Sequence, residues 1–147
     1  MANASFTGLR IVLVLAGAVI IFTGINIAFG GMRTLGWQGE SSFPEVTNEH
    51  AFLVHDSHIR FLGGLWIGVG VLFIVGTTNL LRHRSALNVS FVLMFLGGLA
   101  RFSQMHFEIT LGPEILGSLL AELVGMPLLY FWLSKADTGV NEAVKNS

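Results

Sequence analysis

The chain has no cysteine, few charged residues and only three prolines. The missing cysteine excludes disulfides, thiolate metal sites and a cysteine nucleophile. Charged residues make up 12% of the 147 positions, where a globular protein has about 25%, while 52% are apolar and the mean hydropathy is +0.70. A soluble domain of this composition would have too little polar surface to cover its core. The composition therefore argues against a soluble fold.

Several functional classes leave no trace in the sequence. The formal net charge is −1 and there is no run of basic residues, so a nucleic-acid partner is not expected. Glycine-rich phosphate loops, nucleophile elbows, HExxH and haem-attachment motifs are also missing from the sequence. No catalytic residue or cofactor is indicated, and a role other than an enzyme is favoured.

Four long apolar stretches predict an all-α integral membrane protein with four transmembrane helices in an antiparallel bundle. Between Arg10 and Arg33 lie 22 uncharged residues, and 21 more follow Arg60. About 20 residues at 1.5 Å each cross the hydrocarbon core of a bilayer as a helix. A cleaved signal peptide is the alternative for the first stretch, but signal peptides have shorter apolar cores, of roughly 7–15 residues. The expected spans are 11–32, 58–81, 86–107 and 114–134, with an outer loop at 33–56, in a single domain over 1–147.

Basic residues predict the orientation of these spans. Arg10, Arg82, Arg84 and Lys135 all fall on one side of the membrane, whereas the other side has mostly carboxylates and Arg33. Because cytoplasmic loops carry an excess of basic residues, both termini are expected in the cytoplasm. The protein is accordingly expected in the cell's inner membrane.

Asn26, Arg101 and Glu122 are the most informative polar residues inside the apolar spans, where a central charge costs roughly 2.5–3.5 kcal/mol. Arg101 stands ten residues before Leu111 at the expected turn between spans three and four, and Glu122 stands eleven after it. Near-equal distance from the turn of an antiparallel hairpin means near-equal depth, so these charges can meet. Asn26 falls at a similar level in the outer half. Together Asn26, Arg101 and Glu122 predict a polar pocket for a lipid, quinone or small acid in a binding or accessory protein.

Other interpretations of these residues remain open. A buried Arg–Glu pair can simply fix helix register. Glu122 could instead be the proton site of a small oligomeric, proton-coupled transporter. Arg60 lies nearer the outer surface, with Asp56 at i−4 as an ion-pair candidate, and it either contributes to ligand binding or extends to lipid headgroups.

Spacing adds two local predictions. Gly97, Arg101, Gln104 and Glu108 follow one another at helical intervals and predict a single polar stripe along the third span. Proline after Gly112 suits the first turn of a helix, which marks a tight hairpin before the fourth span.

Histidines and glycines give weaker signals. His55 and His58 would share one helical face on the outer side, which makes them weak candidates for a metal site, and interfacial histidines that change charge with pH are the simpler interpretation. Gly64 and Gly68 form a small-xxx-small pattern for close helix contact, within the chain or in a homo-oligomer. The lipid bilayer is the main partner expected.

Three segments carry a resemblance to a known family. Asp56–Gly70 is an arginine-led, glycine-rich stretch, Gly97–Ser103 has a Gly-Gly-x-x-Arg pattern, and Ala121–Pro127 places a glutamate before a proline. Together they resemble the bacterial membrane family catalogued as domain of unknown function 4345, over about residues 10–134. The resemblance implies a small four-span protein and draws attention to Arg60, Arg101 and Glu122. It implies no reaction, substrate or cofactor, and the outer histidines lie outside its pattern.

Overall fold

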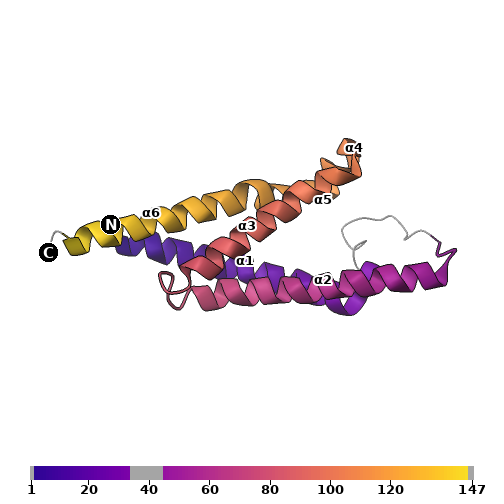
Figure 1. Cartoon of the computed structure of the whole chain (residues 1–147), viewed down its shortest axis with the longest axis horizontal. Coiled ribbons are helices and arrows are strands. Elements are labelled where there is room, and N and C mark those ends of the chain that lie inside the picture. Colours follow the sequence, from indigo (N-terminus) through magenta and orange to yellow (C-terminus); the bar gives the residue numbers. More distant parts are fainter. Residues whose placement is uncertain (1, 34–44, 146–147) are drawn as a thin grey trace. The chain divides into compact units, whose positions relative to one another are not determined.

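The computed structural model describes the backbone of residues 2–33 and 45–145 and the side chains of 6–33 and 45–135. All regular secondary structure in the described residues is helical (Figure 1). A 3₁₀ turn (η2) separates α3 from α4, and a π-helical segment (η3) separates α5 from α6. The elements are α1 Ala2–Gly30, α2 Glu49–Gly76, α3 Arg84–Ala100, η2 Arg101–Gln104, α4 Phe107–Thr110, α5 Pro113–Leu120, η3 Ala121–Gly125 and α6 Met126–Lys145.

Four helical stretches are long and apolar enough to cross a membrane. They cover residues 6–33, 49–76, 84–104 and 113–135, and only 22% of the most apolar window of each is buried. Large apolar side chains therefore face outward, such as Phe29 at 77% exposure and Phe61 at 66%. Exposure on this scale suits helices surrounded by lipid. The predicted all-helical, four-span class is confirmed.

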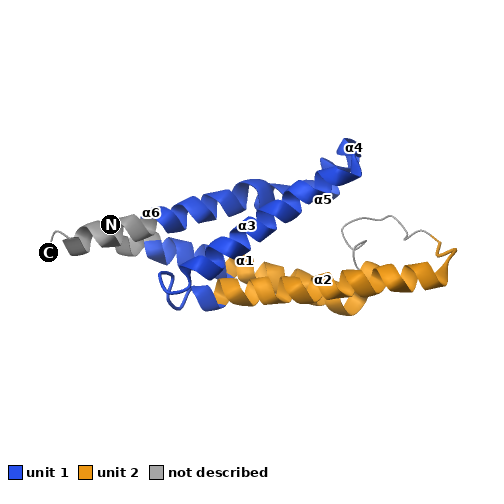
Figure 2. Ribbon diagram, in the orientation of Figure 1, with its two compact units in different colours: residues 1–14, 75–147 blue, residues 15–74 orange. Residues whose placement is uncertain are grey.

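The chain divides into two compact units (Figure 2). Unit 1 contains residues 1–14 and 75–147, and unit 2 contains residues 15–74. Each is described on its own below.

Unit 2 is an antiparallel hairpin in which α1 and α2 pack through glycines. A Cβ added to Gly17 would lie 2.8 Å from the carbonyl oxygen of Gly70, and one added to Gly24 would lie 3.0 Å from that of Gly63. The two glycines on each helix are seven residues apart, so they face the partner helix two turns from each other. We call these four residues the glycine seam. They let the two backbones approach more closely than any larger side chain would allow.

The predicted glycine pair is not the one that packs within this hairpin. A Cβ added to Gly64 or Gly68 would meet no heavy atom within 4 Å, whereas the adjacent Gly63 lies against Ala28. The seam thus occupies a different face of α2. A homo-oligomer contact through Gly64 and Gly68 stays a prediction.

Helix α2 begins and ends earlier than the predicted span of 58–81. Asn48 caps its first turn, because the Asn48 side chain accepts a 3.0 Å hydrogen bond from the backbone N–H of Ala51. The helix ends at Gly76, and Thr78 Oγ1 donates back to the carbonyl of Val75 at 2.7 Å. Residues 49–56, expected in the outer loop, are therefore helical. Charged residues mark where a helix leaves the apolar part of a bilayer, but they do not end the helix.

Unit 1 contains α3 packed antiparallel to η3 and α6. Leu87, Phe91 and Leu133 are almost fully buried, and Met126 is 6% exposed. A Cβ added to Gly76 would lie 2.7 Å from Cδ2 of Leu87, so the end of α2 also packs closely on α3. These contacts form the apolar core of the unit.

The third span is not one continuous helix, as the predicted stripe required. Helix α3 ends at Ala100, η2 follows, and Met105 then takes a left-handed conformation with φ 60°. Glu108 consequently lies on the separate helix α4, so its place on the predicted stripe was wrong. The fully buried Thr110 stabilises this break, since its hydroxyl accepts a 3.0 Å hydrogen bond from Gln104 and donates to the carbonyl of His106 at 3.1 Å.

The predicted start of the fourth span at Pro113 is confirmed, although η2 and α4 lie in the connection before it. Gly112 is the N-cap residue of α5 and Pro113 occupies its first turn. A proline there loses no helical hydrogen bond, since the first N–H groups of a helix have no partner inside it.

Candidate polar site

Arg101 and Glu122 form a two-point ion pair inside unit 1. Arg101 Nε donates to Glu122 Oε2 at 2.8 Å, and Arg101 Nη2 donates to Glu122 Oε1 at 2.7 Å. Parallel hydrogen bonds of this kind are the strongest that a guanidinium makes with a carboxylate. The meeting of the two charges, predicted from their near-equal distance to the turn, is confirmed.

Both partners stand where the helix changes type. Arg101 is the first residue of η2, and Glu122 lies in the π-helical segment η3. Pro127 follows this segment; it lacks an N–H, and its ring would clash with the Leu123 carbonyl in an α-helix. A π-helical segment contains one more residue per turn than an α-helix, and this extra residue lets the helix continue past Pro127. Such segments are rare and occur frequently at functional sites.

The pair is buried unevenly. The Glu122 side chain is 5% exposed and the Arg101 side chain is 30% exposed. Gly98 makes room for the carboxylate, since a Cβ there would lie 2.9 Å from Cβ of Glu122. Within the described part of the chain, the third guanidinium nitrogen, Nη1 of Arg101, has no acceptor. Both N–H groups of Nη1 therefore remain available for a bound molecule.

Asn26 belongs to unit 2. Its side chain donates a 2.8 Å hydrogen bond to the carbonyl of Phe22 on the same helix. Its predicted place in one pocket with Arg101 and Glu122 stays a prediction.

Arg60 and Asp56 close the end of α1 in unit 2. Arg60 Nε donates to Asp56 Oδ2 at 2.6 Å, and Arg60 Nη1 donates to the carbonyl of Phe29 at 2.5 Å. The other oxygen of Asp56 accepts the N–H of Met32 at 2.7 Å. Gly31, between these bonded groups, has φ +64°, a conformation that favours glycine at a helix end. The predicted Arg60–Asp56 pair is confirmed, and these contacts give Arg60 a capping role; ligand binding by Arg60 stays a prediction.

The outer histidines lie on the exposed start of α2. His55 shares a 2.7 Å hydrogen bond between its Nδ1 and the carbonyl of Ala51. Among the residues that the structure describes, no three His, Cys, Asp or Glu side chains come together as a metal site would need. Metal binding by His55 and His58 gains no support from these contacts.

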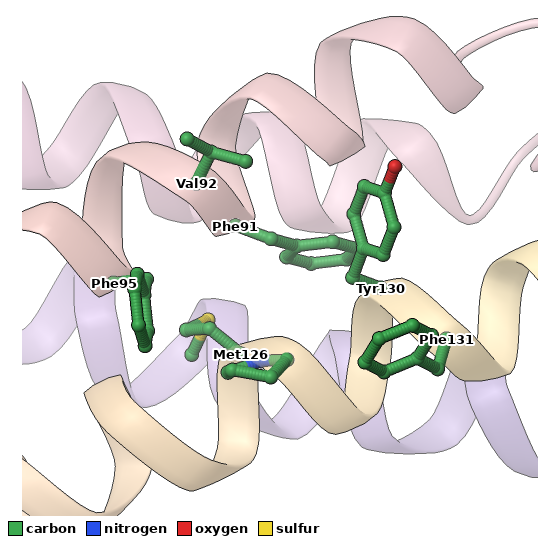
Figure 3. A pocket seen from close by; sticks show the side chains of 7 residues that line it. Phe91, Val92, Phe95, Met126, Tyr130 and Phe131 are labelled. Atoms are coloured by element: carbon green, nitrogen blue, oxygen red, sulfur yellow. The ribbon is translucent and has the colours of Figure 1, made fainter.

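Unit 1 also has an apolar groove that the sequence analysis missed. It encloses about 180 Å³ between α3 and α6, and aromatic rings from both helices border it (Figure 3). The repeated aromatics on each helix were the available signal, but their convergence depends on how the helices pair. The residues that border the groove are Phe91, Val92, Phe95, Met126, Pro127, Tyr130 and Phe131.

These features define the class: an all-helical protein with four membrane-spanning stretches and an ion pair inside one of its helical units. Within that class, the family model described as "Domain of unknown function (DUF4345)" matches residues 8–133, and the chain belongs to this family. The resemblance found in the sequence is therefore confirmed. No curated protein and no solved structure matches the chain.

Proposed function

We propose that the chain is a binding or accessory protein of the inner membrane, and that its Arg101–Glu122 pair holds the polar headgroup of a lipid, quinone or small acid. The observation that carries this proposal is that only part of the Arg101 guanidinium is bonded to Glu122. Glu122 occupies two of its nitrogens, while Nη1 lies on a side chain that is still 30% exposed. The pair thus orients a hydrogen-bond donor that has no protein acceptor among the described residues.

Membrane energetics support a role beyond helix packing. Helices associate in lipid mainly through van der Waals contacts between small residues, as in the glycine seam, and need no buried charges. Charged residues in spans are rare and commonly mark ligand or ion pathways. The helix irregularities at both partners point in the same direction.

Proton-coupled transport is the second candidate, because Glu122 is a carboxylate inside a span. Both of its carboxylate oxygens are already bonded to Arg101, which favours a fixed anchor over a transport site. Proton-driven uptake into proteoliposomes that disappears in Glu122→Gln would favour transport instead.

The test is native mass spectrometry of the detergent-purified protein beside its variants. The double variant R101L/E122L removes both charges without leaving one unpaired, so it is expected to fold and to lose the retained small molecule. The variant D56L/R60L is the control, since it removes the other ion pair and leaves Arg101 intact. A folded R101L/E122L protein that keeps the same bound molecules would contradict the proposal, and loss in the control alone would move the site to Arg60.

A further inference from the structure

The apolar groove and the ion pair adjoin along the same two helices of unit 1. Phe95 borders the groove and lies three residues before Gly98, against which Glu122 packs. On the facing helix α6, Met126 borders the groove four residues after Glu122. Three to four residues are about one helical turn, roughly 5 Å. The groove therefore begins one turn from the carboxylate.

The charge of the site favours a neutral headgroup. Glu122 already neutralises Arg101, so a second anion at Nη1 would lie close to the Glu122 carboxylate and be repelled. A carbonyl oxygen accepts the same N–H groups without this repulsion. The expected ligand thus combines a neutral carbonyl with an apolar chain.

The groove suits such a chain. Four of its seven bordering side chains are aromatic, and Figure 3 shows rings from α3 and α6 facing the same space. From Phe91 to Arg101 the axial distance is about 15 Å at 1.5 Å per residue, a length that the acyl chain of a membrane lipid can follow. Since these helices are membrane spans, ester lipids surround the groove at high concentration.

We propose that unit 1 binds an ester-linked membrane lipid, with the ester carbonyl at Nη1 of Arg101 and its acyl chain in the groove. This inference rests on the proposed ligand-binding role of the Arg101–Glu122 pair, and it places the ester carbonyl next to the headgroup at Arg101. It adds the chemical class of the ligand and a second contact region.

The first experiment compares two lipid probes that differ only in the carbonyl. Purified protein is exchanged into detergent with dioleoylphosphatidylcholine or with its diether analogue, and retention is measured by native mass spectrometry. The wild type is expected to retain the ester lipid about five- to tenfold better, the effect of one net hydrogen bond. R101L/E122L is expected to retain both lipids equally.

The second experiment fills the groove. Val92 borders it and is 47% exposed, so Val92→Trp should occupy the chain site without disturbing the core. Val89, one turn away, is 58% exposed and does not border the groove, which makes Val89→Trp the matched control. Retention of the ester lipid is expected to fall severalfold in the first variant and to be unchanged in the second.

Two outcomes would overturn the lipid assignment alone. The first is equal retention of the ester and ether lipids by the wild type. The second is equal retention of the ester lipid by Val92→Trp and Val89→Trp. In either case Arg101 could still bind another ligand, such as a copurified quinone that is lost in R101L/E122L. Unchanged retention of every bound molecule in a folded R101L/E122L protein would overturn the proposed function as well.

Discussion

At the scale of single residues, the ion pairs Asp56–Arg60 and Arg101–Glu122 have different structural roles. Asp56 and Arg60 are one helical turn apart, and both also bond backbone groups at the end of α1. Arg101 and Glu122 are 21 residues apart, and within the described part of the chain their side chains bond only each other. The first pair completes a helix terminus, whereas in the second Nη1 of Arg101 has no acceptor among the described residues.

The unequal burial of Arg101 and Glu122 predicts strong coupling between them. Arg101→Leu alone would leave a carboxylate that is 5% exposed without its partner, and we expect a loss of about 3 kcal/mol in the free energy of unfolding. R101L/E122L should recover most of that loss. Unfolding in detergent, followed by tryptophan fluorescence, gives the four free energies of this double-mutant cycle. Additive losses would show that the charges do not interact.

Sequence reasoning worked at this scale where one distance decided the result. Counting residues from the turn placed Arg101 level with Glu122, and helical spacing placed Asp56 beside Arg60. Sequence reasoning could not predict the hydrogen bonds that Thr110 makes in the connection between α3 and α5. That connection includes Met105 in a left-handed conformation, which no local sequence pattern requires.

At the scale of elements, helix ends and helix pairing decide how the spans pack. The predicted spans followed charge boundaries, but Asn48 and Thr78 determine where α2 begins and ends. The glycine seam was missed because it depends on how α1 and α2 are aligned along each other, which the sequence does not give. When Gly17 faces Gly70, Gly24 also faces Gly63. The chain has 18 glycines, so composition alone does not single out these four.

Two adjacent glycines of α2 provide a sharp test of the seam. Gly63→Ala would place a methyl group against the backbone of Ala28, and we expect the hairpin to lose about 1–3 kcal/mol of stability. Gly64→Ala meets no heavy atom within 4 Å, so it is expected to be neutral or slightly stabilising, as alanine favours helix. Thermal unfolding of both variants in detergent measures the difference. Equal melting temperatures would contradict close packing at Gly63.

At the scale of the whole molecule, composition and hydropathy were sufficient to predict the class. Four apolar stretches of adequate length specify four helices, because only a helix satisfies its own backbone hydrogen bonds in lipid. The groove at Phe91 and Tyr130 could not be predicted in this way, since apolar residues on a membrane helix fit lipid-facing, core and groove positions equally well.

The absence of cysteine makes the predicted orientation directly testable. A single cysteine at Glu45 should react with a membrane-impermeant maleimide on intact cells, because that segment is expected outside. A single cysteine at Ser85, beside the basic residues Arg82 and Arg84, should react only after the cells are opened. The wild-type chain has no cysteine, so it serves as the unlabelled control. The reverse labelling pattern would place both termini outside.

The glycine seam also bears on how the protein is made. All four seam residues lie between Gly17 and Gly70, so the contact is complete in the chain before α3 has been synthesised. The first two spans can therefore pair as soon as both have entered the bilayer, without waiting for the ion pair of unit 1. Assembly would then proceed from a hairpin held by backbone contact to a second part that brings the buried charges together.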